Sequence, residues 1–161
     1  MIVLKIVLVL VLTVIIWQDV KERLVYWFCY PLVGILGFFI QKSFLESNAI
    51  IINSLVNLSL IATVLLILWV YCKIILKKKL VDQSIGMGDV LFFIALAFCF
   101  SIISFYVLFV FSLFFSLLMH FLLKKSYKEH STIPLAGFMA LFFAFVYCAT
   151  FFINCNFLFA Y

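Results

Sequence analysis

Two of the six acidic residues in this chain occupy places where a carboxylate is energetically costly. Asp19 follows the first apolar run, and Asp89 ends the sequence Gly86-Met87-Gly88-Asp89 just before another apolar run. A carboxylate at membrane depth costs about 2.5–3.5 kcal/mol on insertion scales, so it usually marks a functional site. Glycines allow unusual backbone conformations and close approach of another chain, and a helix dipole favours the ionised form of an aspartate at its start.

Two carboxylates brought together cannot both ionise cheaply, so they share a proton. The ionised partner can activate a water molecule while the protonated partner hydrogen-bonds a carbonyl oxygen, which is the chemistry of aspartic peptidases. A structural alternative makes Asp19 an interfacial charge paired with a lysine and Asp89 a helix N-cap. The other acidic residues lie in expected loops beside basic residues and are interpreted as solvated charges: Glu22, Glu46, Asp82 and Glu129.

The composition requires a bilayer around the elements that position these residues. Of 161 residues, 70% are hydrophobic and 11% are charged, whereas soluble domains are about half apolar and a quarter charged. A water-soluble domain of this size could not bury so much apolar surface. At about 20 residues per crossing, we expect an all-α, polytopic membrane bundle of about six transmembrane helices that forms one domain over residues 1–161.

The apolar runs place these helices along the chain. We expect spans at about residues 2–17, 25–40 and 49–75, and a last span from about residue 133 to the end of the sequence. The run from 90 to 123 would make a helix of about 50 Å, longer than the ~30 Å hydrocarbon core. A tight hairpin near Ser101–Ser104 therefore divides it into the fourth and fifth spans.

The basic residues predict the orientation of the bundle. The loops after spans one, three and five hold nine of the eleven, and only Lys5 and Lys42 lie on the other side. Lys and Arg accumulate on the cytoplasmic side of membranes, so both aspartates should face the cytoplasm and both chain ends should lie opposite. The net charge of +5 is divided among short clusters rather than gathered on one face, which excludes a nucleic-acid partner.

The remaining polar residues predict structural roles. We expect no metal or organic cofactor, because the cysteines lack ligand spacing and lie in or near apolar runs, where buried, apolar packing is typical: Cys29, Cys72, Cys99, Cys148 and Cys155. His120 and His130 are interpreted as interfacial. Three other expectations follow from position: interhelical hydrogen bonds from Asn53 and Asn57, close helix contacts at Gly34 and Gly37, and an interfacial aromatic belt that includes Trp17 and Trp69.

Three segments together resemble the type IV prepilin peptidase family of GxGD membrane aspartyl peptidases. Asp19 leads a short basic loop into the second span, as the family's first aspartate does, and Gly86-Met87-Gly88-Asp89-Val90 matches the second motif. Residues 133–141, which include Pro134 and Gly137, are similar to the family's proline-containing segment at the start of the last helix. The resemblance implies that Asp19 and Asp89 are catalytic, and that Gly86, Met87, Gly88, Pro134 and Gly137 shape the site.

The resemblance is to a short form of the family. Asp19 follows the first helix directly, which leaves no room for the cysteine-bearing cytoplasmic insertion of larger relatives, so their N-methylation activity is not carried over. The chain also has Val25-Tyr26 where many relatives have Ile-Pro, and Leu91 where many have lysine. The implied function is cleavage of the short, basic cytoplasmic leader from pilin-like precursors, in a bacterial cytoplasmic membrane, by an active site that faces the cytoplasm.

Two other functions remain open from the sequence. A small proton-coupled transporter could use the two carboxylates as a relay, although neither repeats nor interrupted helices at mid-membrane depth are apparent. A catalytically inactive relative that serves as a membrane scaffold would keep the same residues.

Overall fold

The computed structural model describes residues 1–21, 24–76, 86–123, 134–152 and 157–160. Every regular element in this part of the chain is helical: α1 (Ile2–Lys21), α2 (Cys29–Gln41), α3 (Ser47–Tyr71), the π-helical turn η1 (Cys72–Leu76), α4 (Met87–Leu96), α5 (Ile102–Leu123), α6 (Leu135–Phe152) and α7 (Phe157–Ala160). The predicted all-α class is confirmed for these residues.

Four of the described helices are long and apolar enough to cross a membrane, which indicates a membrane protein: Ile2–Lys21, Ser47–Ile74, Ile102–Leu123 and Leu135–Phe152. The shorter helices α2 and α4 have 13 and 10 residues. At 1.5 Å per residue they extend about 20 and 15 Å, less than the ~30 Å hydrocarbon core. Helices therefore occur at all six predicted positions, but only four have the length of a full crossing.

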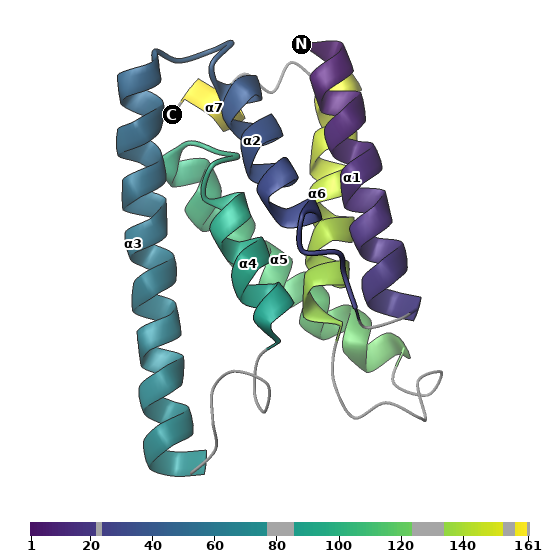
Figure 1. Ribbon diagram of the computed structural model, residues 1–161, viewed down its shortest axis with the longest axis vertical. Helices are drawn as coiled ribbons and strands as arrows, with labels where there is room; N and C mark the ends of the chain where they lie inside the picture. Colours follow the sequence, from purple (N-terminus) through teal and green to yellow (C-terminus); the bar gives the residue numbers. More distant parts are fainter. Residues whose placement is uncertain (22–23, 77–85, 124–133, 153–156, 161) are drawn as a thin grey trace.

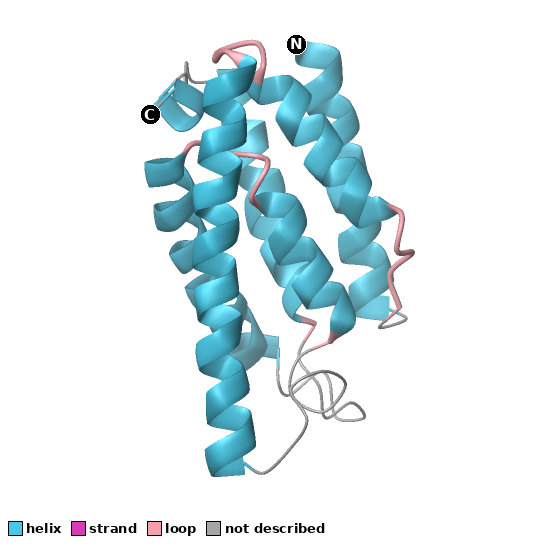
Figure 2. Cartoon of the chain, turned by 60° about the vertical axis from the view of Figure 1, so that its left-hand side comes forward, coloured by secondary structure: helices cyan, strands magenta, loops and turns pink. Residues whose placement is uncertain are grey.

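The helices alternate in direction, so that distant parts of the sequence meet at one end of the bundle (Figure 1). The N-terminus and α7 lie at the upper end, and the C-terminal end of α1 lies at the lower end with the N-terminal ends of α4 and α6. α1 packs mainly along α6 and α2, and α2 packs along α4. The turned view in Figure 2 shows the same bundle, with helix axes lying roughly along one direction.

Small residues allow α2 to pack closely on α4 and on the residues that follow it, as predicted for Gly34 and Gly37. A Cβ atom on Gly37 would lie 2.9 Å from the Cα atom of Cys99, and one on Gly34 would lie 3.5 Å from the carbonyl oxygen of Ala95. Only a glycine therefore fits at position 37, whereas an added methyl at position 34 would make an ordinary van der Waals contact.

A bend at residues 97–101 separates α4 from α5, slightly earlier than the predicted hairpin at Ser101–Ser104. Its position is explained by four consecutive carbonyl groups that accept hydrogen bonds from side chains of other helices. Asn57 donates to Ala97 (3.1 Å) and Phe100 (3.0 Å), Gln41 donates to Phe98 (3.3 Å), and the Tyr147 hydroxyl donates to Cys99 (3.4 Å). The predicted interhelical role of Asn57 is confirmed, and it is Asn57 that holds the bend.

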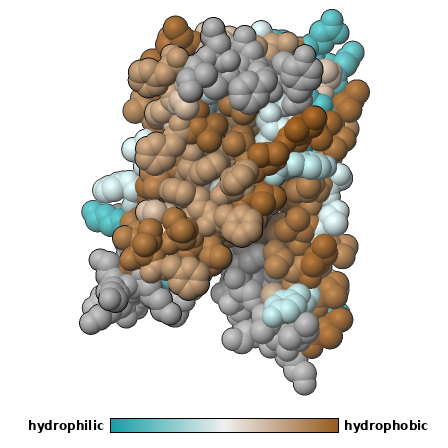
Figure 3. All heavy atoms as spheres, turned by 180° about the vertical axis from the view of Figure 1, so that it is seen from behind, coloured by the Kyte–Doolittle hydropathy of each residue, from teal (hydrophilic) through white to brown (hydrophobic). Residues whose placement is uncertain are grey.

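The outer surface is suited to lipid. Among the coloured atoms, the face seen in Figure 3 is hydrophobic over most of its height, with hydrophilic groups near its edges. Two lysines at the lower ends of α1 and α3 lie over half-exposed tryptophan rings, with Lys21 Nζ 4.8 Å from Trp17 and Lys73 Nζ 4.6 Å from Trp69. Such pairs are typical of the membrane–water boundary. Most of the predicted basic loop residues, together with Glu22, Asp82, Glu129 and His130, lie outside the described residues.

The end of the chain differs from the prediction. The last long helix does not continue to the end of the sequence but ends at Phe152, and α7 is a separate short helix. Phe159 of α7 is buried and stacks on Phe44 and Phe100, with ring centroids 5.0 and 6.0 Å apart. α7 therefore packs beside the α2–α3 connection and the bend.

Candidate active site

The site is organised by the first turn of α6, whose backbone N–H groups have no partners within the helix. Pro134 precedes α6 and is buried, and its carbonyl oxygen accepts a hydrogen bond from the Phe138 N–H at 3.2 Å. A proline at this position offers no side-chain acceptor, so the amides of Ala136 and Gly137 must be satisfied from elsewhere. These are the two amides that an N-cap side chain normally serves.

Asp19 supplies one of the missing acceptors. It lies in the last turn of α1 and is half-buried, and its Oδ2 accepts a hydrogen bond from the Gly137 N–H at 2.5 Å. Position 137 must be a glycine for this contact, because an added Cβ would lie 2.9 Å from Oδ2 and 3.1 Å from the Cβ of Asp19. Gly137 therefore shapes the site by letting α1 and α6 approach closely.

Asp89 supplies the other acceptor. It is the third residue of α4, and its Oδ1 accepts a hydrogen bond from the Ala136 N–H at 2.8 Å. Its Oδ2 accepts a second bond from the Gly86 N–H at 3.2 Å, which is one half of a capping box. Asp89 thus caps two helices at once, its own and α6.

The structure therefore brings Asp19 and Asp89 together on consecutive amides of one helix N-terminus. Helix N-termini favour negative charge, yet a carboxylate pair at such a site still repels itself. Asp89 lies at the end of α4, outside the four helices long enough to cross a membrane. Burial, opposed by the Ala136 amide and reinforced by the charge of Asp19, raises the pKa of Asp89 from 3.8 to about 6. Burial therefore outweighs the preference for the ionised form that a helix N-terminus gives an aspartate.

The two motif glycines do not provide unusual backbone conformations, contrary to the sequence-based expectation. Gly86 is extended, with φ −68° and ψ 144°, and neither it nor Gly88 has a left-handed φ. Gly88 does provide close approach, because an added Cβ would lie 2.5 Å from the Tyr30 hydroxyl oxygen. Met87, the first residue of α4, is exposed.

Tyr30 is a site residue that the sequence did not indicate. It lies in the first turn of α2, is only 3% exposed, and its ring packs at a tilt on Phe92, with centroids 6.2 Å apart. Its hydroxyl lies within electrostatic range of both Asp19 and Asp89. A tyrosine within an apolar run resembles any interfacial aromatic residue, so only the packing of α2 on α4 reveals this position.

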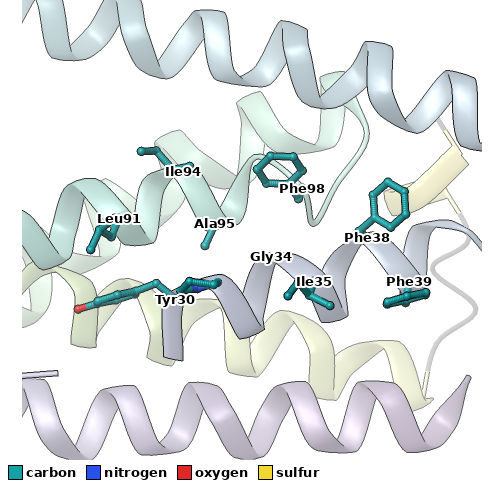
Figure 4. Close-up of a pocket in the computed structure, with 10 residues that line it drawn as sticks. Tyr30, Gly34, Ile35, Phe38, Phe39, Leu91, Ile94, Ala95 and Phe98 are labelled. Atoms are coloured by element: carbon teal, nitrogen blue, oxygen red, sulfur yellow. The ribbon is translucent and has the colours of Figure 1, made fainter. Parts of the chain in front are cut away.

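An apolar pocket of about 470 Å³ runs between α2 and α4 and begins at Tyr30 (Figure 4). Ile35, Phe38 and Phe39 line it from α2, Leu91 and Ile94 line it from α4, and Phe98 lines it from the bend. Figure 4 shows Tyr30 at one end of the row of α2 side chains, with its hydroxyl pointing away from them. One residue that lines the pocket, Tyr30, thus also lies near both carboxylates.

Both departures from the family pattern have structural consequences. The Tyr26 N–H donates a hydrogen bond to Oε1 of the buried Gln18 at 3.1 Å, and a proline at position 26 could not make this bond. Leu91 lines the pocket, where a lysine would place a charge on an otherwise apolar wall.

Among the described residues, no three His, Cys, Asp or Glu side chains lie together as a set of metal ligands. The fold and the site define a class: a helical membrane protein with two carboxylates on the N-terminus of one buried helix. No family model, curated protein or solved structure matches the chain. Its function is therefore argued from the site.

Proposed function

We propose that this chain is a membrane aspartyl endopeptidase that removes the short cytoplasmic leader from pilin-like precursors. One observation carries the proposal: Asp19 and Asp89, from helices far apart in the sequence, accept hydrogen bonds from the adjacent amides of Gly137 and Ala136. A single scaffold thus holds both carboxyl groups, and the raised pKa of Asp89 favours the singly protonated pair that aspartic peptidases use.

In the proposed reaction, Asp19 is the ionised partner and Asp89 the protonated one. Asp19 takes a proton from a water molecule, and the oxygen of that water bonds to the scissile carbonyl carbon. At the same time, the Asp89 hydroxyl donates a hydrogen bond to the carbonyl oxygen. The carbon–nitrogen bond then breaks, and the leaving amine takes up a proton from the pair. The α6 amides remain bonded to both carboxylates and stabilise the negative charge as it moves between them.

The surroundings suit a substrate that is polar on one side of the cut and apolar on the other. The pocket between α2 and α4 has an apolar lining, so it can receive the apolar segment of a precursor that begins after the cut. The predicted basic cytoplasmic side would place the pair where a precursor leader lies. The proposed location is a bacterial cytoplasmic membrane, with the chain crossing it several times and its active site facing the cytoplasm.

The test replaces each aspartate with asparagine. Asp19→Asn keeps an oxygen for the Gly137 amide but cannot exchange a proton, so the protein should fold and lose cleavage. Asp89→Asn keeps one of its two amide bonds, and the exposed Gly86 N–H can turn to water. Because the two groups act as one unit, the double variant should be scarcely worse than either single variant.

The assay follows trimming of a precursor that has a short basic leader, a glycine before the cut and an apolar helix after it. Purified protein in detergent is used with a chelator present. Glu46→Gln is the matched control, since Glu46 is exposed at the start of α3 and its side chain makes no cap bond. Cleavage that persists in both single Asn variants, or that stops only when metal is chelated, contradicts the two-aspartate mechanism.

One observation favours a second candidate, an inactive scaffold. Both carboxylates satisfy helix amides, which is also what purely structural caps do. A scaffold predicts that a carboxylate can be replaced by asparagine without functional loss and that no precursor is trimmed by the unaltered protein. The same experiment therefore separates the two candidates.

A further inference from the structure

Tyr30 is a largely buried residue whose hydroxyl the two-aspartate reaction does not yet use. The described residues give it no hydrogen-bond partner, and its ring is held between Phe92 and the backbone at Gly88. A hydroxyl beside a carboxylate pair, with no partner among the described residues, is a donor available to a group that arrives with the substrate.

The geometry restricts where that partner can lie. The hydroxyl approaches Gly88 so closely that any larger residue there would collide with it, and Asp89 follows Gly88 in the chain. It is also within electrostatic range of both carboxylates. The other end of the Tyr30 ring lines the apolar pocket (Figure 4). Tyr30 therefore lies between the place of bond cleavage and the place proposed for the apolar part of the substrate.

We infer that Tyr30 is a third catalytic residue, whose hydroxyl donates a hydrogen bond to the oxygen of the scissile carbonyl as negative charge develops there. The inference rests on the proposed peptidase function. No proton is transferred: the hydroxyl keeps its hydrogen, and the proton steps remain with Asp19 and Asp89. Gly88 is required because it leaves room for this hydroxyl, which gives the second glycine of the motif a physical reason.

The first test is Tyr30→Phe, which keeps the ring packed on Phe92 and removes only the donor. Loss of one donor to a developing oxyanion typically lowers kcat by about 10²-fold or more. We expect about a hundredfold lower kcat, a KM within about threefold of the unaltered protein, and an unchanged pH profile. Unaltered kcat overturns the inference. A displaced pH profile also overturns it, since that would mean that Tyr30 acts through the carboxylates.

A second test needs no substrate and measures, through the free energy of unfolding, whether the Tyr30 hydroxyl lies against Gly88. Gly88→Ala should destabilise the unaltered protein, because its Cβ would lie 2.5 Å from the hydroxyl oxygen. In a Tyr30→Phe background the nearest ring atom, Cζ, lies 3.4 Å away, an ordinary contact. The same alanine should then cost little in unfolding free energy, so the two changes are coupled. An equal cost in both backgrounds would show that the hydroxyl does not lie at Gly88.

The outcomes separate this inference from the proposed function. If Asp19→Asn and Asp89→Asn both retain cleavage, the peptidase proposal fails, and the Tyr30 inference fails with it. If both lose cleavage while Tyr30→Phe retains full kcat, the carboxylate pair stands and only the role of Tyr30 is wrong.

Discussion

The bend at residues 97–101 and the first turn of α6 both need side chains to hydrogen-bond their backbone polar groups, but they use side chains of opposite kinds. Both expose backbone polar groups inside an apolar bundle, where an unpaired group costs several kcal/mol. The bend has free carbonyl groups, which the neutral donors Asn57, Gln41 and Tyr147 satisfy. The α6 turn has free amides, which two carboxylates satisfy.

This difference supports the proposal that the carboxylate pair is a functional site. A neutral serine or asparagine would cap α6 adequately, and the bend shows that neutral side chains suffice elsewhere in this molecule. Two neighbouring carboxylates add the cost of desolvation and mutual repulsion. Two carboxylates at a position where neutral caps would be less destabilising are the pattern expected of a functional site.

The largest effect is expected when a neutral donor at the bend is replaced by a carboxylate. Asn57→Asp would place a carboxylate against the carbonyl oxygens of Ala97 and Phe100, with no donor left for one or both. We expect a loss of about 3–5 kcal/mol of unfolding free energy at pH 8, measured by denaturant titration in detergent. The loss should shrink as the pH falls, because protonation removes the buried charge.

The matched control for this exchange is Asn48→Asp, which lies exposed in the first turn of α3, where a negative charge is favourable. It should leave the unfolding free energy unchanged within about 0.5 kcal/mol. An Asn57→Asp protein as stable as the control would mean that the bend does not depend on its neutral donors.

The second prediction moves a carboxylate rather than replacing it. Gly137→Ala places a Cβ against Asp19 and should displace its carboxylate from the α6 amide. Small displacements of reacting groups cost up to about 10²-fold in rate, so we expect cleavage to fall by about ten- to a hundredfold. Precursor trimming measures the effect, and unfolding measured in parallel separates it from a folding defect. Full activity would show that Asp19 need not be held by Gly137.

The third prediction concerns the pH dependence of the carboxylate pair at α6 and does not apply to the bend. The pKa of Asp89 is raised from 3.8 to about 6, so its proton is lost as the pH rises through about 6. Since the reaction needs that proton, cleavage should fall by about tenfold per pH unit above this value. The fold should lose stability at lower pH, as the pH rises from 3.8 to about 6, because only the folded state keeps the proton in that window. Above about pH 6 this group should cause no further loss of stability. A pH profile that stays flat to pH 9 would contradict the assignment of Asp89 as the proton donor.

The smallest effect is expected at a neutral contact beside the site. Tyr26→Pro removes the N–H that Gln18 accepts and leaves a buried amide oxygen unpaired. This should cost about 1 kcal/mol of unfolding free energy, measured by the same denaturant titration. Tyr26→Phe keeps the N–H and is the control. A larger loss of cleavage than of stability would show that the α1–α2 connection contributes to the site directly.

The sequence predicted the helices and the costly residues because both depend on local composition. Apolar runs specify helices in a bilayer, and Asp19 and Asp89 were identified by the energy of placing a carboxylate beside such runs. The lengths of α2 and α4 could not be predicted, because apolar residues continue past Leu96 through the bend. The bend is placed by Asn57 and Gln41, and nothing in the composition of residues 97–101 specifies those partners.

The parts of the site that depend on close packing were also beyond the sequence. Tyr30 gains its position only when α2 lies against α4 at Gly88, and the resemblance to known peptidases did not include it. Pro134 was expected to begin the last helix, but its consequence, two amides left for side chains from other helices, needed the fold. The raised pKa of Asp89 likewise follows from burial, which the helix-dipole argument from sequence did not weigh.

The trans-capping of α6 also sets an order of events during synthesis. Asp19 and Gly137 are 118 residues apart, and Asp89 and Ala136 are 47 apart. A ribosome therefore delivers both carboxylates to the membrane well before the helix that binds them. Until α6 inserts, the α6 amides that hold the two carboxylates together are absent. A chain interrupted before residue 134 would carry both aspartates but hold no assembled pair, so the proposed cleavage would require the last long helix.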